Sequence, residues 1–336
     1  MARHYRTSND RNRQIKKMAA VLAVLVLVIV LFVILGRVID SQQTQEDGGV
    51  ASYATVEING IKCKPKTRIK TYLFMGVDAN SKKTNDTEDE YATNQCDMLE
   101  LVVIDQNANT YARVPINRNT ITEVNSLEED GTFLATTEVQ IALAYANGDG
   151  AEISCQNAVD AVSNLFYGQK IDGYAALYMD SIKVLNNLAG GITVTIEDDF
   201  SQRDPSMELG KTITLSDEQA VHFVRGRMDV GDGSNEGRMR RQEVYLGKLE
   251  DKLFEKLQAD QSYALDVYGA LIDYMVTSLS EKDCSKLAKA VVENENLGSM
   301  EIAGEVSEDE FGFKEFIIDE DSLADVVIDL FYERLE

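Results

Sequence analysis

A short arginine-rich segment is the strongest sign of chemistry in the sequence. Residues 225–241 read RGRMDVGDGSNEGRMRR and contain five arginines: Arg225, Arg227, Arg238, Arg240 and Arg241. A guanidinium group presents paired N–H donors that match the oxygen atoms of a phosphate. The glycines predict a loop that leads into a helix, and a helix N-terminus also attracts anions. The segment therefore predicts an anion site. The alternative is a solvated loop whose charge is balanced by the acids within it.

Two aspartates form a second candidate group. Asp78 follows the apolar run 71–77, and Asp97 precedes the apolar run 99–105. If these runs are neighbouring strands, both carboxylates lie at the same edge of a sheet. Carboxylate oxygens suit Mg²⁺, which prefers oxygen ligands and often bridges to phosphates. The pair is consistent with a metal site, although ordinary aspartates at strand ends remain the simpler interpretation of this pattern alone.

A third candidate is Arg118, which follows the strand-like run 110–116. The runs 99–105 and 110–116 are separated by a polar turn and predict a hairpin. A single arginine after a strand is usually solvated. Beside a carboxylate pair and an arginine loop, it would add another phosphate ligand.

Several chemistries are excluded by residue type. Histidine occurs only at His4 and His222, so neither a Ser-His-Asp hydrolase nor an HExxH metalloprotease is indicated. No Walker loop or dinucleotide-binding fingerprint is present. The cysteines are widely spaced and form no CxxC pair, so we expect free or buried thiols rather than a zinc site. They are Cys63, Cys96, Cys155 and Cys284.

The elements that must position these residues alternate along the chain. Strand-like runs at 71–77, 99–105, 110–116 and 173–178 are interspersed with helical patterns at 138–147, 152–166, 236–257 and 262–279. Ser216 and Gln219 have the spacing of a capping box, and Gly190 is placed to end a helix. The alternation predicts an α/β fold, a layered α/β/α domain with a central mixed β-sheet.

One segment is long and apolar enough to cross a membrane. Residues 19–36 read AAVLAVLVLVIVLFVILG without a charge. As a helix they would span about 27 Å, close to the ~30 Å hydrocarbon core. Basic residues concentrate before the segment, so we expect a cytoplasmic N-terminus and an extracellular remainder. A cleaved signal peptide fits less well, because the run exceeds a typical signal-peptide core and no small-x-small site follows cleanly.

The charge balance limits the partners. The chain has 33 basic and 57 acidic residues, a net charge of −24. Such a protein does not bind nucleic acid through a general basic surface, so any anion site must be local. The tail is also acidic, but Ser322–Leu335 carries an apolar stripe that predicts a docked helix rather than a partner-binding segment.

These patterns divide the chain into five regions. We expect a basic cytoplasmic tail, a transmembrane helix, a juxtamembrane linker, an extracellular catalytic domain and a helical, acidic C-terminal region. Their ranges are 1–18, 19–36, 37–69, 70–258 and 259–336.

Eight short motifs recur in the order found in one protein family. They are residues 76–78 (GVD), 95–99 (QCDML), 116–120 (INRNT), 142–148 (ALAYANG), 174–180 (YAALYMD), 188–192 (LAGGI), 224–227 (VRGR) and 237–242 (GRMRRQ). Each motif is weak alone, but their shared order is specific. Over about residues 70–257 the sequence resembles the LytR-CpsA-Psr family of cell-wall proteins.

The resemblance implies a Mg²⁺-dependent phosphotransferase at the outer face of the cell membrane. Such a protein moves a glycopolymer from a polyprenyl pyrophosphate carrier to peptidoglycan and releases polyprenyl phosphate. By this resemblance Asp78 and Asp97 would hold the metal. Arg118, Arg225 and Arg227 would be catalytic, and together with Arg238 and Arg241 they would bind the pyrophosphate.

The sequence departs from the family pattern at three of these motifs. Before the last one, Asn235 and Glu236 stand where the family usually has an aspartate just ahead of Gly-Arg. Gln95 stands where the family usually has arginine, and Asn119 stands where it usually has aspartate. An amide cannot accept a proton, so a general-base role at residue 119 would be lost. Two other functions therefore stay open: a non-catalytic protein that binds lipid pyrophosphate or wall polymer, and a hydrolase that releases the carrier into water.

Overall fold

The computed structural model describes residues 55–79, 94–128, 130–226, 228–233, 235–259, 263–310 and 312–335. The predicted membrane segment, residues 19–36, lies outside them. Within the described ranges, no helix combines the length and apolar character needed to cross a bilayer. The chain divides into two compact units. In the described residues, the smaller unit comprises 180–273, and the larger one comprises 55–179 and 274–335.

The larger unit is built on a six-stranded sheet with the order β11-β8-β3-β4-β5-β12. Its strands are β3 (Ile69–Val77), β4 (Cys96–Asp105), β5 (Thr110–Ile116), β8 (Gly173–Tyr178), β11 (Met275–Thr277) and β12 (Glu295–Ser299). The β3–β4, β4–β5 and β8–β11 pairs are antiparallel, whereas β3–β8 and β5–β12 are parallel. The predicted hairpin and the predicted mixed sheet are therefore confirmed.

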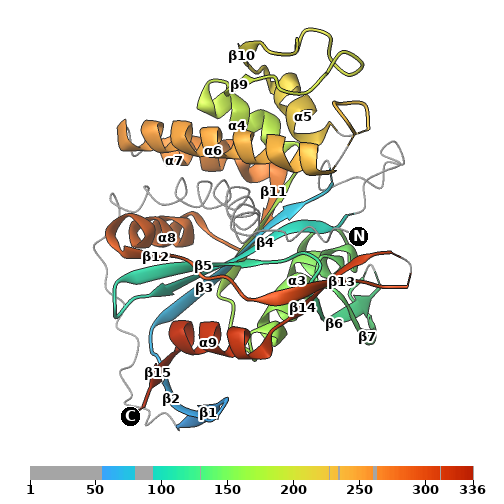
Figure 1. Ribbon diagram of the computed structural model, residues 1–336. Helices are drawn as coiled ribbons and strands as arrows, with labels where there is room; N and C mark the ends of the chain where they lie inside the picture. The colour runs from blue at the N-terminus through green and yellow to red at the C-terminus, as the bar shows by residue number, and fades with distance from the viewer. Residues whose placement is uncertain are drawn as a thin grey trace, which may run out of the picture. The chain divides into compact units, whose positions relative to one another are not determined.

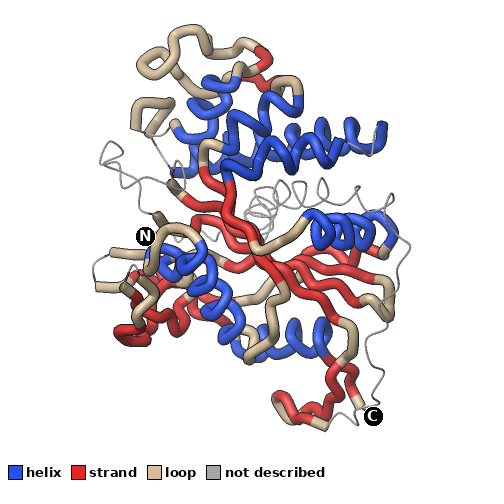
Figure 2. The backbone as a smooth tube through the Cα atoms, turned by 180° about the vertical axis from the view of Figure 1, so that it is seen from behind, coloured by secondary structure: helices blue, strands red, loops and turns tan. Residues whose placement is uncertain are grey.

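Helices cover both faces of this sheet. Helices α3 (Glu152–Leu165) and α9 (Glu320–Phe331) lie on one face, and α8 (Glu281–Glu293) lies on the other (Figures 1 and 2). On the α3/α9 face, Leu99 and Leu101 of β4 are buried in one hydrophobic core with residues of both helices. This arrangement is the layered α/β/α architecture expected from the alternating sequence pattern.

The hairpin that follows β5 differs from our expectation. Strands β6 (Ile121–Leu127) and β7 (Phe133–Gln140) pair in antiparallel fashion, and only the short helix α2 (Leu143–Ala146) follows. The helix predicted over 138–147 is therefore wrong in its first part. The run FLATTEV in β7 is rich in β-branched residues, which favour a strand. The Thr136 hydroxyl also donates to Asn125 Oδ1 across the hairpin at 2.9 Å.

The C-terminal region contains more strands than we expected. Helix α7 (Tyr263–Leu271) is followed by a 3₁₀ turn and β11, so the helix predicted over 262–279 ends earlier. Strands β11 and β12 both join the central sheet. The expected boundary between residues 258 and 259 consequently does not coincide with the division between the units, which falls after Asp273.

The acidic tail is docked, as its apolar stripe predicts. Leu323, Val327 and Leu330 of α9 are buried in the core, and Asp319 caps the helix by accepting the backbone N–H groups of residues 321 and 322. After α9 the chain forms β15 (Tyr332–Arg334), which pairs with β2 (Ile61–Pro65). Strand β1 (Val56–Ile58) completes this small three-stranded sheet.

The smaller unit is mainly helical. It contains α4 (Ser181–Ala189), α5 (Asp217–Arg225), α6 (Asn235–Ala259) and α7, together with the short strands β9 (Thr193–Thr195) and β10 (Thr212–Thr214). Gly190 ends α4 with a φ of 81°, a left-handed conformation that favours glycine. The predicted capping box of Ser216 and Gln219 opens α5. Both boundary predictions are confirmed.

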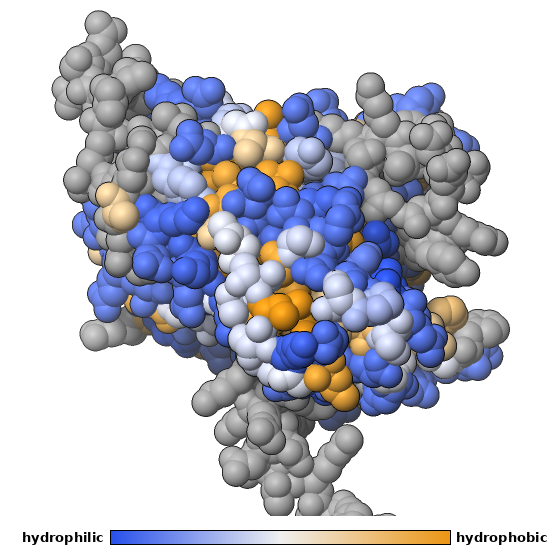
Figure 3. All heavy atoms as spheres, turned by 90° about the horizontal axis from the view of Figure 1, so that it is seen from above, coloured by the Kyte–Doolittle hydropathy of each residue, from blue (hydrophilic) through white to orange (hydrophobic). Residues whose placement is uncertain are grey.

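The described cysteines are buried, as expected. Cys63 and Cys96 are free thiols, Cys155 is completely buried, and the side chain of Cys284 lies outside the described part of the structure. The visible surface reflects the composition. On the face shown in Figure 3, hydrophilic residues predominate and apolar residues form small areas between them.

One buried arginine ties three segments of the smaller unit together. Arg241 on α6 is only 4% exposed. Its Nε donates to the carbonyl oxygen of Phe223 at 3.0 Å, one terminal nitrogen donates to Asp198, and the other donates to the carbonyl oxygen of Gly226. Its guanidinium also lies 5.5 Å from the ring centroid of Phe200. These partners lie after β9 and around the end of α5, so Arg241 joins both regions to α6.

We expect Arg241→Met to lower the free energy of unfolding by about 3 kcal/mol, because it leaves the mostly buried Asp198 carboxylate without its closest partner. Arg240→Met is the matched control, since Arg240 also contacts Asp198 but is largely exposed. The control should cost less than about 1 kcal/mol. Urea unfolding measures both values, and equal losses would contradict the anchoring role of Arg241.

Candidate functional site

The two predicted metal ligands lie at the same end of neighbouring strands. In the antiparallel β3–β4 pair, Gly76 lies opposite Met98 and Val77 lies opposite Cys96, with an irregular register between them. The backbone N–H of Asp78 then donates to the carbonyl oxygen of Gln95 at 2.9 Å. Asp78 and Asp97 therefore meet the condition set by the sequence, that both carboxylates lie at one sheet edge.

Arg118 joins this group because β5 runs back along β4. The pairing of Leu99 with Ile116 brings the loop after β5 beside the start of β4. One terminal nitrogen of Arg118 donates to Asp97 Oδ1, and the other donates to Gln95 Oε1. The side chains of Arg118 and Asp97 are 34% and 44% exposed, so this charge-assisted pair is open to a ligand from solvent.

The backbone around this pair is held by the segment that precedes α2. Ala142 N donates to the carbonyl oxygen of Arg118 at 3.1 Å, and Ala142 O accepts from Cys96 N at 3.0 Å. Two buried hydroxyls, those of Tyr145 and Tyr178, lie 3.0 Å apart and both donate toward the carbonyl oxygen of Gly150. Residue spacing alone did not identify Ala142, although the ALAYANG motif contains it.

Cys96 lies next to the site but does not take part in it. Its side chain is completely buried, and its Sγ donates to the carbonyl oxygen of Met98 at 2.9 Å. Burial raises the pKa of the Cys96 thiol, and the neighbouring Asp97 carboxylate raises it further. The thiol is therefore neutral at physiological pH and is unsuited to be a nucleophile or a metal ligand.

The number of carboxylates at this sheet edge fits a magnesium ion. Mg²⁺ in proteins is often held by one or two carboxylates, while water and substrate phosphates fill its other positions. Asp78 and Asp97 supply that number of carboxylates. Within the described residues, no group of three or more histidine, cysteine, aspartate or glutamate side chains could hold a metal without such help. Magnesium at this site stays a prediction.

The arginine-rich segment belongs to the smaller unit. Arg225 is the last residue of α5, and Arg238 lies in the first turn of α6, where it is partly exposed. Arg227 lies outside the described residues. Gly226 allows the tight turn after α5, because a Cβ there would lie 2.6 Å from Val230 Cγ2 and 2.8 Å from the carbonyl oxygen of His222. The segment thus begins with a turn that only glycine fits.

Charged residues of this segment form ion pairs with residues elsewhere in the smaller unit. Arg203 donates twice to Asp229, at 2.9 Å to each oxygen, and Asp198 accepts from both Arg240 and Arg241. Arg203 and Asp198 lie 26 and 42 residues from these partners, so local sequence patterns gave no signal for them. All three nitrogens of the Arg241 guanidinium donate within the unit, which gives this residue a structural role.

A small cavity of about 150 Å³ adjoins these arginines. Phe223, Arg240, Arg241 and Lys248 contribute to its wall. Glu197 also lines the cavity, and Arg240 and Arg241 are both paired with Asp198, so the anion site predicted for this segment stays a prediction. The individual roles of Arg225, Arg227, Arg238 and Arg241 in pyrophosphate binding stay predictions.

Two curated proteins resemble this chain over part of its length. The polyisoprenyl-teichoic acid–peptidoglycan teichoic acid transferase TagU of Enterococcus faecalis is 34% identical over 145 residues, which cover 43% of this chain and 45% of that protein. Biofilm regulatory protein A of Streptococcus mutans is 29% identical over 191 residues, which cover 54% of this chain and 43% of that protein. The chain thus spans less than half the length of each relative.

Solved structures share the fold. The protein gbs0355 from Streptococcus agalactiae is 22% identical, with a TM-score of 0.55 over 78% of this chain and 88% of that one. TagV of B. subtilis is 20% identical, with a TM-score of 0.50 over 79% of this chain and 96% of that one. Moreover, the model of the LytR_cpsA_psr family matches residues 37–330, and this chain therefore belongs to that family.

Proposed function

We propose that this protein transfers a glycopolymer from a polyprenyl pyrophosphate carrier to peptidoglycan and releases polyprenyl phosphate. The observation that carries the proposal is the Asp97–Arg118 pair, which lies partly exposed at the strand end that also holds Asp78. Membership of the LytR_cpsA_psr family supports it. The name of the Enterococcus faecalis relative also describes transfer of teichoic acid from a polyisoprenyl carrier to peptidoglycan.

The proposed reaction breaks one phosphorus–oxygen bond and forms another. The hydroxyl oxygen of the acceptor attacks the phosphorus atom that bears the glycopolymer, while the bond from this phosphorus to the bridging oxygen breaks. Polyprenyl phosphate leaves with the bonding electrons, and the hydroxyl proton passes to a base. Negative charge accumulates on the phosphate oxygens, where guanidinium groups stabilise it most. Arg118 would donate to these oxygens, and Asp97 would hold its guanidinium in position.

Mg²⁺ bound by Asp78 and Asp97 would neutralise charge on the two phosphates. The chain's own contribution is the placement of these carboxylates next to Arg118. Arg225, Arg227 and Arg238 are proposed as further ligands of the pyrophosphate. Each guanidinium group presents paired donors that match the phosphate oxygens of such a substrate.

One observation favours a protein that binds the carrier without turnover. Gln95 accepts a hydrogen bond from Arg118, so both terminal nitrogens of this arginine are engaged by protein side chains. The family usually has a second arginine at residue 95, and the amide supplies no positive charge. Asn119 likewise lacks the carboxylate that could accept the hydroxyl proton. Retained binding with weak or absent transfer is therefore the second candidate function.

A third component of the proposal is the membrane anchor. Residues 19–36 would hold the chain in the cell membrane, with the N-terminus in the cytoplasm and residues 37–336 outside. A lipid-linked substrate would then share the membrane with the enzyme, which raises its local concentration.

We expect Asp97→Asn to lower kcat/KM for transfer by about 10²–10³-fold, because it removes one charge that positions Arg118 and the metal. The assay follows release of lipid phosphate from a lipid pyrophosphate-sugar in the presence of Mg²⁺ and a glycan acceptor. Asp160→Asn is the control, since Asp160 is exposed on α3 and away from the strand ends. Release without acceptor would identify a hydrolase instead, and unchanged transfer by Asp97→Asn would remove the site assignment.

We expect Asn119→Asp to raise the rate of transfer about tenfold or more, because a carboxylate can accept the proton of the attacking hydroxyl. The substitution keeps the size of the side chain, and the backbone contact from Phe316 N to the carbonyl oxygen of residue 119 is retained. Binding of the lipid pyrophosphate, measured separately by calorimetry, should change little. Tight binding with no turnover in either form would favour the binding function.

We expect the full chain to sediment with membranes and to resist extraction by high salt, whereas replacement of both Leu25 and Val28 by arginine should release it. Each charge at the centre of a membrane helix costs about 2.5–3.5 kcal/mol on insertion scales. Fractionation followed by immunoblotting measures the distribution. A double variant that stays membrane-bound under the same conditions would count against the anchor.

A further inference from the structure

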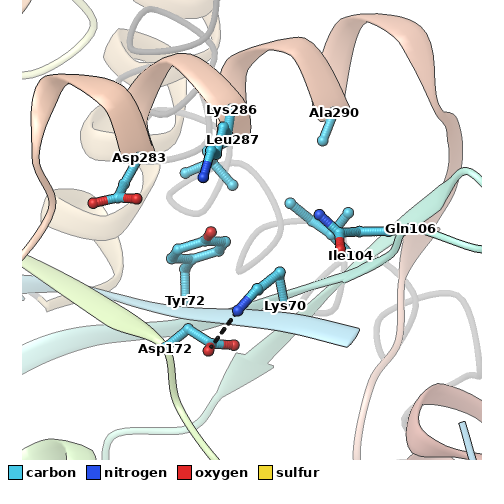
Figure 4. Close-up of a pocket in the computed structure, with 9 residues that line it drawn as sticks. All are labelled: Lys70, Tyr72, Ile104, Gln106, Asp172, Asp283, Lys286, Leu287 and Ala290. Carbon is cyan, nitrogen blue, oxygen red and sulfur yellow. Dashed lines mark hydrogen bonds and ion pairs between the residues drawn. The ribbon is translucent and has the colours of Figure 1, made fainter. Parts of the chain in front are cut away.

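A second cavity lies in the larger unit, at the opposite end of β3 from Asp78. It has a volume of about 240 Å³ and lies between the sheet and α8 (Figure 4). Lys70, at the start of β3, lines it. Asp78 lies eight positions after Lys70, which is about 26 Å along a strand. This cavity is therefore distinct from the proposed site of transfer.

The floor of the cavity is apolar. Tyr72 of β3, Ile104 of β4 and Leu287 of α8 line it, and all three are buried. Gly173 on the adjacent strand β8 lies beside the ring of Tyr72 and leaves room for Leu279, because a Cβ at this position would lie 2.4 Å from Leu279 Cδ2 and 3.4 Å from Tyr72 Cδ1. An aliphatic or aromatic group would find a surface here from which water is easily displaced.

The two carboxylates at the rim are committed to partners within the protein. Asp172 accepts from Lys70 at 3.0 Å, from Lys170 at 2.8 Å and from the backbone N–H of Thr71 at 3.0 Å. Burial alone would raise the pKa of Asp172, but these hydrogen bonds outweigh it and the pKa is lowered. Asp283 accepts from the hydroxyl and the backbone N–H of Ser280 in the capping box of α8.

The remaining cation at the rim is Lys286. It lies on the same side of α8 as the lining residues Asp283 and Ala290, which are three and four positions from it. No ion pair or hydrogen bond joins its ammonium group to any of the described residues. In Figure 4 its side chain points from α8 toward Tyr72. Among the described residues, the cavity thus combines an apolar floor with one ammonium group that pairs with no carboxylate.

We propose that this cavity binds a small amphiphilic anion, with its apolar body on Tyr72, Ile104 and Leu287 and its carboxylate or phosphate head on Lys286. A volume of about 240 Å³ corresponds to roughly eight water molecules at ~30 Å³ each, which suits a head group with a short alkyl chain of roughly six to eight carbons. Medium-chain fatty acids and alkyl phosphates share this chemistry. The amide of Gln106 at the rim supplies a further donor for either head group.

The test compares ligands that differ only in their head group. Octanoate, octyl phosphate and octanol are titrated into the full chain in nonionic detergent micelles, with the same micelles without protein as the blank, and binding is followed by ligand-observed NMR and calorimetry. We expect at least one of the two anions to bind about fivefold more tightly than octanol, the advantage of one exposed charge contact. The stronger of the two identifies the head group. Equal binding of all three, or no binding, would overturn the proposal.

Two variants locate the site. Lys286→Gln should weaken the preferred anion to the level of octanol while leaving octanol unchanged, and Ala290→Phe should fill the cavity and abolish binding of both. Lys282→Gln is the matched control, because Lys282 is exposed on the same helix and does not line the cavity. An equal loss in the Lys282 and Lys286 variants would indicate nonspecific attraction and would overturn the assignment.

The test of anion binding can fail or succeed independently of the test of the proposed transfer. Asp97→Asn, which should impair transfer, should leave anion binding at this cavity unchanged. If Asp97→Asn weakened octanoate binding as strongly as Lys286→Gln, the ligand would occupy the strand end at Asp97 and the cavity assignment would be wrong. Lys286 is exposed, so its replacement by glutamine should leave the fold intact, and circular dichroism confirms this before titration.

Discussion

The pairing of β4 on both sides is the constraint on which the larger unit depends. This strand has β3 on one edge and β5 on the other, and six consecutive residues, Leu99–Ile104, are buried. The start of β4 places Asp97, and Gln95 just before the strand, at the ends of β3 and β5, where Asp78 and Arg118 lie. Its last residues place Ile104 in the floor of the second cavity. A change of register in β4 would therefore alter both places at once.

Strand β4 also contains a buried charged residue, whose removal from water is energetically unfavourable. Glu100 is completely buried, and the guanidinium Nε of Arg113 on β5 lies 3.7 Å from its Oε1. A buried ion pair recovers its desolvation energy only partly, so it adds little net stability compared with an apolar pair. It does oppose a slip of one strand along the other, because such a slip would leave a charge buried without its partner. The pair thus supports the register that the candidate site requires.

Sequence patterns correctly predicted the elements that depend on residues close together in the chain. The hairpin of β4 and β5, the end of α4 at Gly190 and the capping box of α5 all follow from residues close together in sequence. Strands β11, β12 and β15 were missed because they are short and their partners lie more than 90 residues away.

In the candidate site, too, contacts between residues close in sequence were predictable and distant contacts were not. Asp97 and Arg118 are 21 residues apart on consecutive strands, and their proximity was predictable. The ties of Asp198 to Arg240 and Arg241 depend on packing within the smaller unit, and the rim of the second cavity combines residues as distant as Lys70 and Lys286.

The pairing of β2 with β15 has a consequence for the order in which the molecule can form. Strand β2 gains this partner only when residues 332–334 have been made, and Lys66 N can donate to the carbonyl oxygen of Phe331 no earlier. The edges of the central sheet likewise wait for β11 and β12. At ordinary rates of synthesis this interval lasts on the order of tens of seconds, during which β5 and β8 have open edges that can pair with other chains. The sheets of the larger unit are therefore complete only after the C-terminal strands β11, β12 and β15 have been made. A chain that ended at residue 306 would contain β11 and β12 but lack α9 and β15, so β2 would have no β15 partner and the core residues that α9 covers would be exposed to chaperones and proteases.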